Sequence, residues 1–158
     1  MAKPVSRILV INDEHLVLRE FVKGLNSAAR TLDNPLGIAF IGVTTAKEAL
    51  AVIESERDLQ AVLVDDTLYT LSKNGSSRKK LQMSALELVQ RITRFRPELD
   101  VYILIAQEKE DDVVDALFTE AVDGYFYREE RDHRGIYRIL NAQIQERART
   151  PFTDQPKS

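Results

Sequence analysis

Five short apolar runs, each followed by apolar residues at helical spacing, constrain the fold of this chain more than any other feature. The runs are about strand length and rich in branched or aromatic side chains, and they comprise residues 8–11, 38–43, 61–64, 101–105 and 124–127. Strict alternation of strand and helix requires right-handed crossovers and a parallel sheet with helices on both faces. The sequence therefore predicts a doubly wound, five-stranded α/β domain.

A single domain is expected, because 158 residues with 44% hydrophobic composition provide one sizeable core and not two. We assign residues 1–150 to this domain and residues 151–158 to a tail or the start of a linker, since Pro151 would strain a helix at Thr150. Residues 67–84, between the third strand and the next helix, form a long connection for this architecture. In the first predicted helix, Leu16 and Phe21 are expected to face the core.

The charge and composition of the chain argue against several functions. With 22 basic and 25 acidic residues, the net charge of −3 gives no overall positive field for binding nucleic acid. The chain has no Cys, so disulfides and thiolate metal sites are excluded. No apolar run approaches the roughly 20 residues that span a bilayer, and no signal peptide is visible. We expect a cytoplasmic protein that binds neither nucleic acid nor membrane.

Acidic residues follow the first and third predicted strands. The first strand leads into Asn12, Asp13 and Glu14, and the third leads into Asp65 and Asp66. Ligands of open parallel sheets bind at the carboxyl ends of the strands, so we expect carboxylates from these two strands to lie close together. A hard divalent cation such as Mg²⁺ would relieve their repulsion, because it prefers oxygen ligands. Asp13 and Asp65 are therefore the candidate metal ligands, and one of them could accept a phosphoryl group.

Several segments resemble the receiver domains of two-component response regulators, and the match covers most of the chain. Residues 7–14 resemble the family's first strand and acidic pair, and Asp65 falls where the phospho-acceptor stands. Residues 86–88 resemble the start of the family's third helix, and residues 124–128 resemble the end of its fifth strand. The resemblance implies a flavodoxin-like, receiver-like (βα)5 fold. A working receiver with these residues would be phosphorylated on Asp65.

The chain departs from the receiver pattern at three points. The family's first pocket acid is Asn12 here, and Ile105 or Ala106 replaces the hydroxyl residue that ends the fourth strand. The Lys-Pro pair after the fifth strand reads Arg128-Glu129. An aliphatic side chain cannot hydrogen-bond a phosphoryl oxygen, and a planar guanidinium does not substitute conservatively for a compact ammonium.

These departures favour a non-catalytic pseudo-receiver over a phosphorylation switch. In this interpretation Asp13, Asp65 and Arg128 form a structural charge network, and the pocket binds Mg²⁺ only weakly. The alternative is a phospho-accepting receiver in two-component signalling, with Asp65 as acceptor.

A second, narrower resemblance is to the N-terminal wing domains of bacterial ornithine, lysine and arginine decarboxylases, which are receiver-like with degenerate phosphorylation sites. The similar parts are residues 41–45, the long connection after the third strand, residues 122–126 and a Pro-Phe junction at 149–152. The resemblance implies a regulatory or assembly domain at the front of a decarboxylase, with pyridoxal phosphate bound only downstream. Self-association or contact with that downstream domain would follow. Neither His15 nor His133 precedes the Lys that holds this cofactor in the family.

Other candidate residues have simpler interpretations. A basic cluster could bind an anion, but its interleaved Ser and Gly residues favour a solvated segment; it comprises Lys73, Arg78, Lys79 and Lys80. His15 and His133 lack partners at metal-ligand spacing, so surface or helix-end positions are expected. Tyr125 is expected to be a half-buried strand residue. A free-standing adaptor, with a partner bound by its last two helices, is a third possibility.

Overall fold

A single parallel sheet of five strands forms the centre of the computed structural model, which describes residues 6–65, 85–105, 122–127 and 132–149. The strands are β1 (Ser6–Ile11), β2 (Ile38–Val43), β3 (Leu59–Asp65), β4 (Asp100–Ile105) and β5 (Gly124–Tyr127). Their order is β2-β1-β3-β4-β5, and every neighbouring pair is parallel. This order is one of the two common doubly wound arrangements, so the predicted fold class is confirmed.

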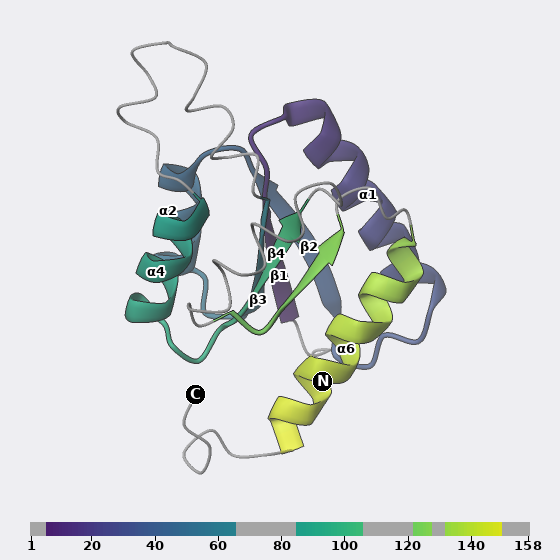
Figure 1. Ribbon diagram of the computed structural model, residues 1–158. Coiled ribbons are helices and arrows are strands. Elements are labelled where there is room, and N and C mark those ends of the chain that lie inside the picture. Colours follow the sequence, from purple (N-terminus) through teal and green to yellow (C-terminus); the bar gives the residue numbers. More distant parts are fainter. Residues whose placement is uncertain (1–5, 66–84, 106–121, 128–131, 150–158) are drawn as a thin grey trace.

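Helices cover both faces of this sheet (Figure 1). The described helices are α1 (His15–Thr31), α2 (Ala46–Ser55), α4 (Ala85–Phe95) and α6 (His133–Arg149). Helices α1 and α6 lie side by side on one face, and α2 and α4 lie on the other. The helix predicted around residues 113–118, the connection 67–84 and the tail 151–158 lie outside the described residues. In the described segments, no helix has the length and apolar character needed to cross a membrane.

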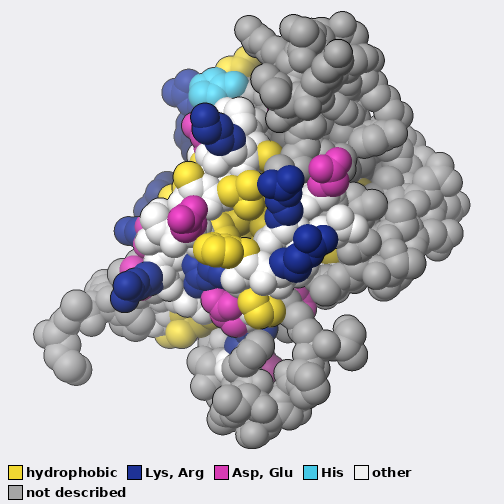
Figure 2. Space-filling model, turned by 90° about the vertical axis from the view of Figure 1, so that its left-hand side faces the viewer, with side chains coloured by type: hydrophobic (Ala, Val, Ile, Leu, Met, Phe, Trp, Pro, Cys, Tyr) yellow, Lys and Arg dark blue, Asp and Glu magenta, His cyan; other side chains and the backbone are white. Residues whose placement is uncertain are grey.

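Alternate residues of each central strand enter two separate apolar layers. On β1, Leu9 and Ile11 pack toward α2 and α4, whereas Ile8 and Val10 pack toward α1 and α6. Strands β1, β3 and β4 are buried along nearly their whole length, as expected of parallel strands covered on both faces. Figure 2 shows the outer side of the α2–α4 layer, where hydrophobic side chains gather near the centre and charged side chains surround them.

The prediction for Leu16 is wrong. This side chain is 72% exposed, whereas Leu18 and Leu25 are buried against the sheet. Residues two positions apart in an α-helix are separated by about 200° around the helix axis. A helix that buries Leu18 against the sheet therefore turns Leu16 toward solvent. Phe21 is partly buried and packs against the core, as predicted.

Thr45 is the N-cap of α2. Its hydroxyl accepts a hydrogen bond from the Glu48 backbone N–H at 3.1 Å. The Glu48 carboxylate accepts hydrogen bonds from the hydroxyls of Thr45 and Thr44, and these lower the pKa of Glu48. The capping-box residues therefore interact, although the returning backbone donor is Thr44 N–H rather than that of the cap residue.

We expect Leu88→Ala to lower the free energy of unfolding by about 2–5 kcal/mol, because Leu88 is fully buried between α4 and the sheet. Leu16→Ala removes the same atoms from an exposed side chain and should change the free energy of unfolding by no more than about 0.5 kcal/mol. Urea denaturation of both variants measures the difference. Equal losses for the two variants would contradict the burial of Leu88 in the core.

Candidate functional site

Asn12 and Asp65 meet at the carboxyl ends of β1 and β3. The two strands are neighbours, with Ile11 paired to Val64, so the next residue on each strand lies at the same edge of the sheet. The Asn12 side-chain amide donates a hydrogen bond to Asp65 Oδ2 at 2.8 Å. Asp65 is 0% exposed and Asn12 is 3% exposed. The structure therefore brings together Asn12 and Asp65, which are 53 positions apart, whereas the expected approach of the Asp13 carboxylate to Asp65 stays a prediction.

The orientation of the Asn12 amide follows from its second partner. The Glu14 backbone N–H, which can only donate, is 2.8 Å from Asn12 Oδ1. The amide oxygen must face that N–H group, so the amide nitrogen faces Asp65. Asn12 thus presents a hydrogen-bond donor to the carboxylate, where an aspartate would present a second negative charge.

The other described residues of the predicted pocket differ in their exposure. Asp13 is half-buried, and Glu14 is exposed at the N-cap of α1 without a side-chain cap hydrogen bond. Ile105, the last residue of β4, is fully buried in the α2–α4 layer and carries no hydroxyl. The remaining predicted site residues lie outside the described part of the chain: Asp66, Lys73, Arg78, Lys79, Lys80, Ala106 and Arg128.

The described residues fit a divalent cation only in part. They contain no group of three or more His, Cys, Asp or Glu side chains that could hold a metal ion. Asp13 and Asp65 supply carboxylate oxygens, but Asn12 directs an N–H group at one oxygen of Asp65. A cation at this site and the Asn12 amide hydrogen would compete for the lone pairs of Asp65 Oδ2, which would weaken binding of the cation. Weak Mg²⁺ binding stays a prediction.

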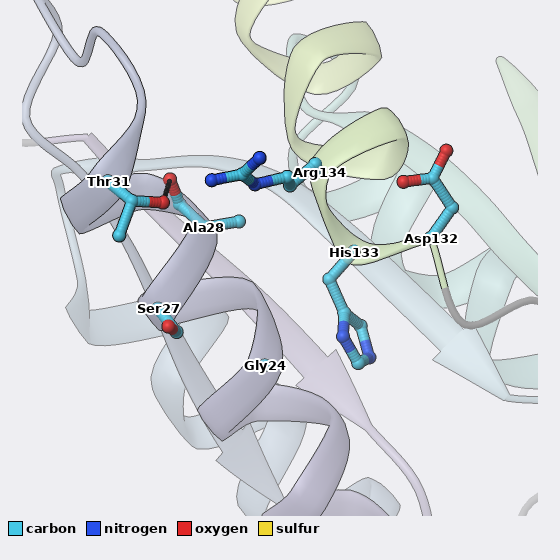
Figure 3. Close-up of a pocket in the computed structure, with 7 residues that line it drawn as sticks. All are labelled: Gly24, Ser27, Ala28, Thr31, Asp132, His133 and Arg134. Carbon is cyan, nitrogen blue, oxygen red and sulfur yellow. Dashed lines mark hydrogen bonds between the residues drawn. The ribbon is translucent and has the colours of Figure 1, made fainter.

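A pocket of about 340 Å³ lies between α1 and α6, and the sequence did not indicate it. In Figure 3, His133 points toward α1 at Gly24, and Arg134 extends toward the end of α1 that carries Thr31. The His133 ring lies 5.5 Å from the Phe21 ring in an edge-on arrangement, and a Cβ at residue 24 would collide with it. His133 is therefore a packing residue at a helix start, close to the predicted helix-end position.

A second cavity of about 400 Å³ lies beside β5 and is lined by aromatic side chains, among them Tyr102 and Tyr125. Tyr125 is 37% exposed, and its ring meets that of Tyr127 edge-on at 5.7 Å. The pKa of Tyr102 is raised well above its usual range, mainly by burial and further by Asp100 and Asp123. Tyr102 thus remains a neutral phenol at any physiological pH.

Comparison with known proteins supports the fold and goes no further. No protein-family model matches the chain, and no curated protein matches its sequence. A response regulator receiver domain protein from Clostridium thermocellum matches with a TM-score of 0.66 and 18% identity, over 91% of this chain and 98% of that one. A CheY-like receiver domain protein from Methanospirillum hungatei matches with a TM-score of 0.66 and 19% identity, and the match covers 92% of this chain and 98% of that one.

A longer protein contains a similar domain. NtrX from Brucella abortus matches with a TM-score of 0.66 and 20% identity, and the match covers 91% of this chain and 28% of NtrX. The chain therefore has the flavodoxin-like fold of receiver domains, which occurs both in short proteins and within longer ones.

We expect Asn12→Asp to lower the free energy of unfolding by about 3 kcal/mol at pH 7.5, because it replaces a buried donor with a like charge beside Asp65. Repulsion raises the folded-state pKa of the introduced carboxyl above its unfolded value. The penalty is therefore small near pH 4 and grows as pH rises through that folded-state pKa. Urea denaturation at the two pH values measures it.

Gln143→Glu adds the same charge at an exposed position of α6 and serves as the control. We expect it to change the free energy of unfolding by no more than about 0.5 kcal/mol. Millimolar Mg²⁺ should restore part of the stability of Asn12→Asp and leave the control unchanged. An Asn12→Asp variant as stable as the original protein at pH 7.5 would refute this account of the pair.

Proposed function

We propose that this chain is a receiver-like regulatory or assembly domain that acts without accepting a phosphoryl group. The observation that carries the proposal is the state of Asp65, which is 0% exposed and hydrogen-bonded to Asn12 at 2.8 Å. A carboxylate attacks phosphorus through a free oxygen lone pair. Here burial and the Asn12 amide both oppose the approach of a phosphodonor to that oxygen.

Charge at the site supports the same proposal. Transfer of a phosphoryl group to a carboxylate brings anions together, and a bound divalent cation offsets their repulsion. Asn12 replaces one carboxylate that would attract the cation and permanently supplies a partial positive charge to Asp65. The apolar Ile105 at the end of β4 offers no hydrogen bond to a phosphoryl oxygen.

A phospho-accepting receiver is the second candidate, and one observation favours it. Asp65 and the half-buried Asp13 still follow the adjacent strands β3 and β1 at the edge where such sheets bind ligands. The two candidates differ in the chemistry of Asp65 and can be separated directly.

Incubation with acetyl phosphate and Mg²⁺ should leave the mass of the protein unchanged. Intact-mass spectrometry at neutral pH detects a gain of one phosphoryl group, and Asp65→Asn provides the matched control because it keeps the shape of the side chain. We expect the same spectrum from both proteins. A stoichiometric gain in the original protein that is absent from Asp65→Asn would establish the signalling receiver instead.

We further propose that the domain belongs to a pyridoxal-phosphate-dependent ornithine, lysine or arginine decarboxylase, as its N-terminal domain. The support is the resemblance of residues 41–45, 122–126 and 149–152 to the wing domains of that family. The end of α6 also suits a junction, because Arg147 is held to the buried Asp100 by an ion pair at 3.2 Å. The direction of the chain at the end of α6 is thereby tied to the base of β4.

The gene provides the test of this parentage. We expect the reading frame to continue past the codon for Ser158 into a pyridoxal-phosphate-binding domain, and sequencing of the transcript shows whether it does. A stop codon directly after Ser158 would leave the pseudo-receiver proposal standing and remove the decarboxylase.

A further inference from the structure

The strand at one edge of the sheet, β2, lacks the usual protection against pairing with another strand. Residues 38–43 read Ile-Ala-Phe-Ile-Gly-Val, with no charged residue and no proline. Edge strands usually carry Lys, Pro or a bulge, because their open backbone groups would otherwise pair with a second chain. A short, uncharged segment of high β-propensity is also the composition that aggregates most readily. Some other feature has to protect this edge.

The backbone groups that face away from the sheet on β2 belong to alternate residues. The carbonyl of Val43 accepts from Asn12 N–H, and that of Gly37 accepts from Ser6 N–H, so odd-numbered residues bond to the β1 side. The backbone groups of Ile38, Phe40 and Gly42 therefore point to the open edge.

Two asparagine side chains occupy this edge. Asn26 of α1 donates to the Phe40 carbonyl at 3.0 Å and accepts from the Phe40 N–H at 2.8 Å. Asn34, in the loop before β2, forms the same pair with Ile38, at 3.1 and 2.8 Å. Each amide thus satisfies both the donor and the acceptor of one residue, as a neighbouring strand would.

We infer that Asn26 and Asn34 act as a substitute for a neighbouring strand and close the β2 edge to strand addition by a second copy of this chain. A primary amide carries the same donor and acceptor as a peptide group, so it can replace one. Two of the three outward-facing residues are closed in this way. Only Gly42 remains without such a side chain among the described residues, and one residue cannot hold a strand. A dimer of the protein would therefore have to form through a surface other than this edge.

The partner that the two amides exclude is a second β2. Two copies of an edge strand related by a two-fold axis pair antiparallel through identical residues, so the exposed edge would be self-complementary. The inference depends on the contacts at Ile38 and Phe40 and is independent of the chemistry of Asp65.

Hydrogen exchange tests the closed edge in the unmodified protein. The amide hydrogens of Ile38 and Phe40 should exchange at least about tenfold more slowly than that of Gly42, because only the first two are hydrogen-bonded to side chains. Exchange at Phe40 as fast as at Gly42, measured by NMR, would overturn the inference.

Cross-linking tests the consequence. The chain has no Cys, so Ala39→Cys introduces a single thiol on β2. We expect mild oxidation to yield disulfide-linked dimers of the Ala39→Cys protein only when Asn26→Leu and Asn34→Leu are also present. Asn141→Leu in the same Ala39→Cys background is the matched control, since Asn141 lies on α6 and its Oδ1 has no hydrogen-bond partner among the described residues.

Circular dichroism and a cooperative thermal transition establish that each variant is folded. If the double variant does not fold, Asn34→Leu alone, which opens the start of the strand, is measured in the same way. A folded edge variant that cross-links no more than the Asn141→Leu control would show that the two amides do not close the edge.

Discussion

Polar groups that the sheet removes from water each need a hydrogen-bond partner, and this requirement shapes the molecule beyond its apolar core. Three asparagine amides meet it. Asn12 satisfies the carboxylate of Asp65, while Asn26 and Asn34 satisfy backbone groups of the edge strand β2. All three use the same property, a donor and an acceptor on one short, uncharged side chain. In each case one amide occupies the place that a second charge or a neighbouring strand could take.

Much of the fold could be predicted from the sequence because hydrophobic period is a local signal. Strands β1, β3 and β4 are largely apolar runs, as expected of parallel strands buried on both faces, and their alternation with helices predicts a parallel, doubly wound sheet. The order of the strands comes from the structure. The helical spacing of Leu16 with other apolar residues predicts a core position for it, whereas the buried side of α1 is set by Leu18 and Leu25. The roles of Asn26 and Asn34 could not be predicted. The Asn26 amide bonds to the backbone of Phe40, 14 positions along the chain, and the Asn34 amide bonds to the backbone of Ile38 across a turn. Neither contact leaves a pattern in the sequence.

The candidate site was predicted in its position and less well in its chemistry. Because β1 and β3 are neighbouring parallel strands, Asp65 at the carboxyl end of β3 lies beside the carboxyl end of β1. The direction of the Asn12 amide, however, follows from the Glu14 N–H, a contact that exists only once α1 has formed. Structural matches at 18–20% identity show the same separation of fold and site, because the backbone arrangement is retained while most side chains differ. The shared fold therefore does not identify the function of this chain.

The packing of α6 against α1 has a consequence for how the chain acquires its structure. His133 fills the space that Gly24 leaves open, and Ile136, Tyr137, Leu140 and Ile144 complete the apolar layer over Ile8 and Val10. The first described strand is thus covered on this face by α1 and by the last described helix, α6. During synthesis, the part of this face that α6 covers remains exposed until α6 has been made. We therefore expect the apolar layer on this face to be completed only after α6 has been synthesised.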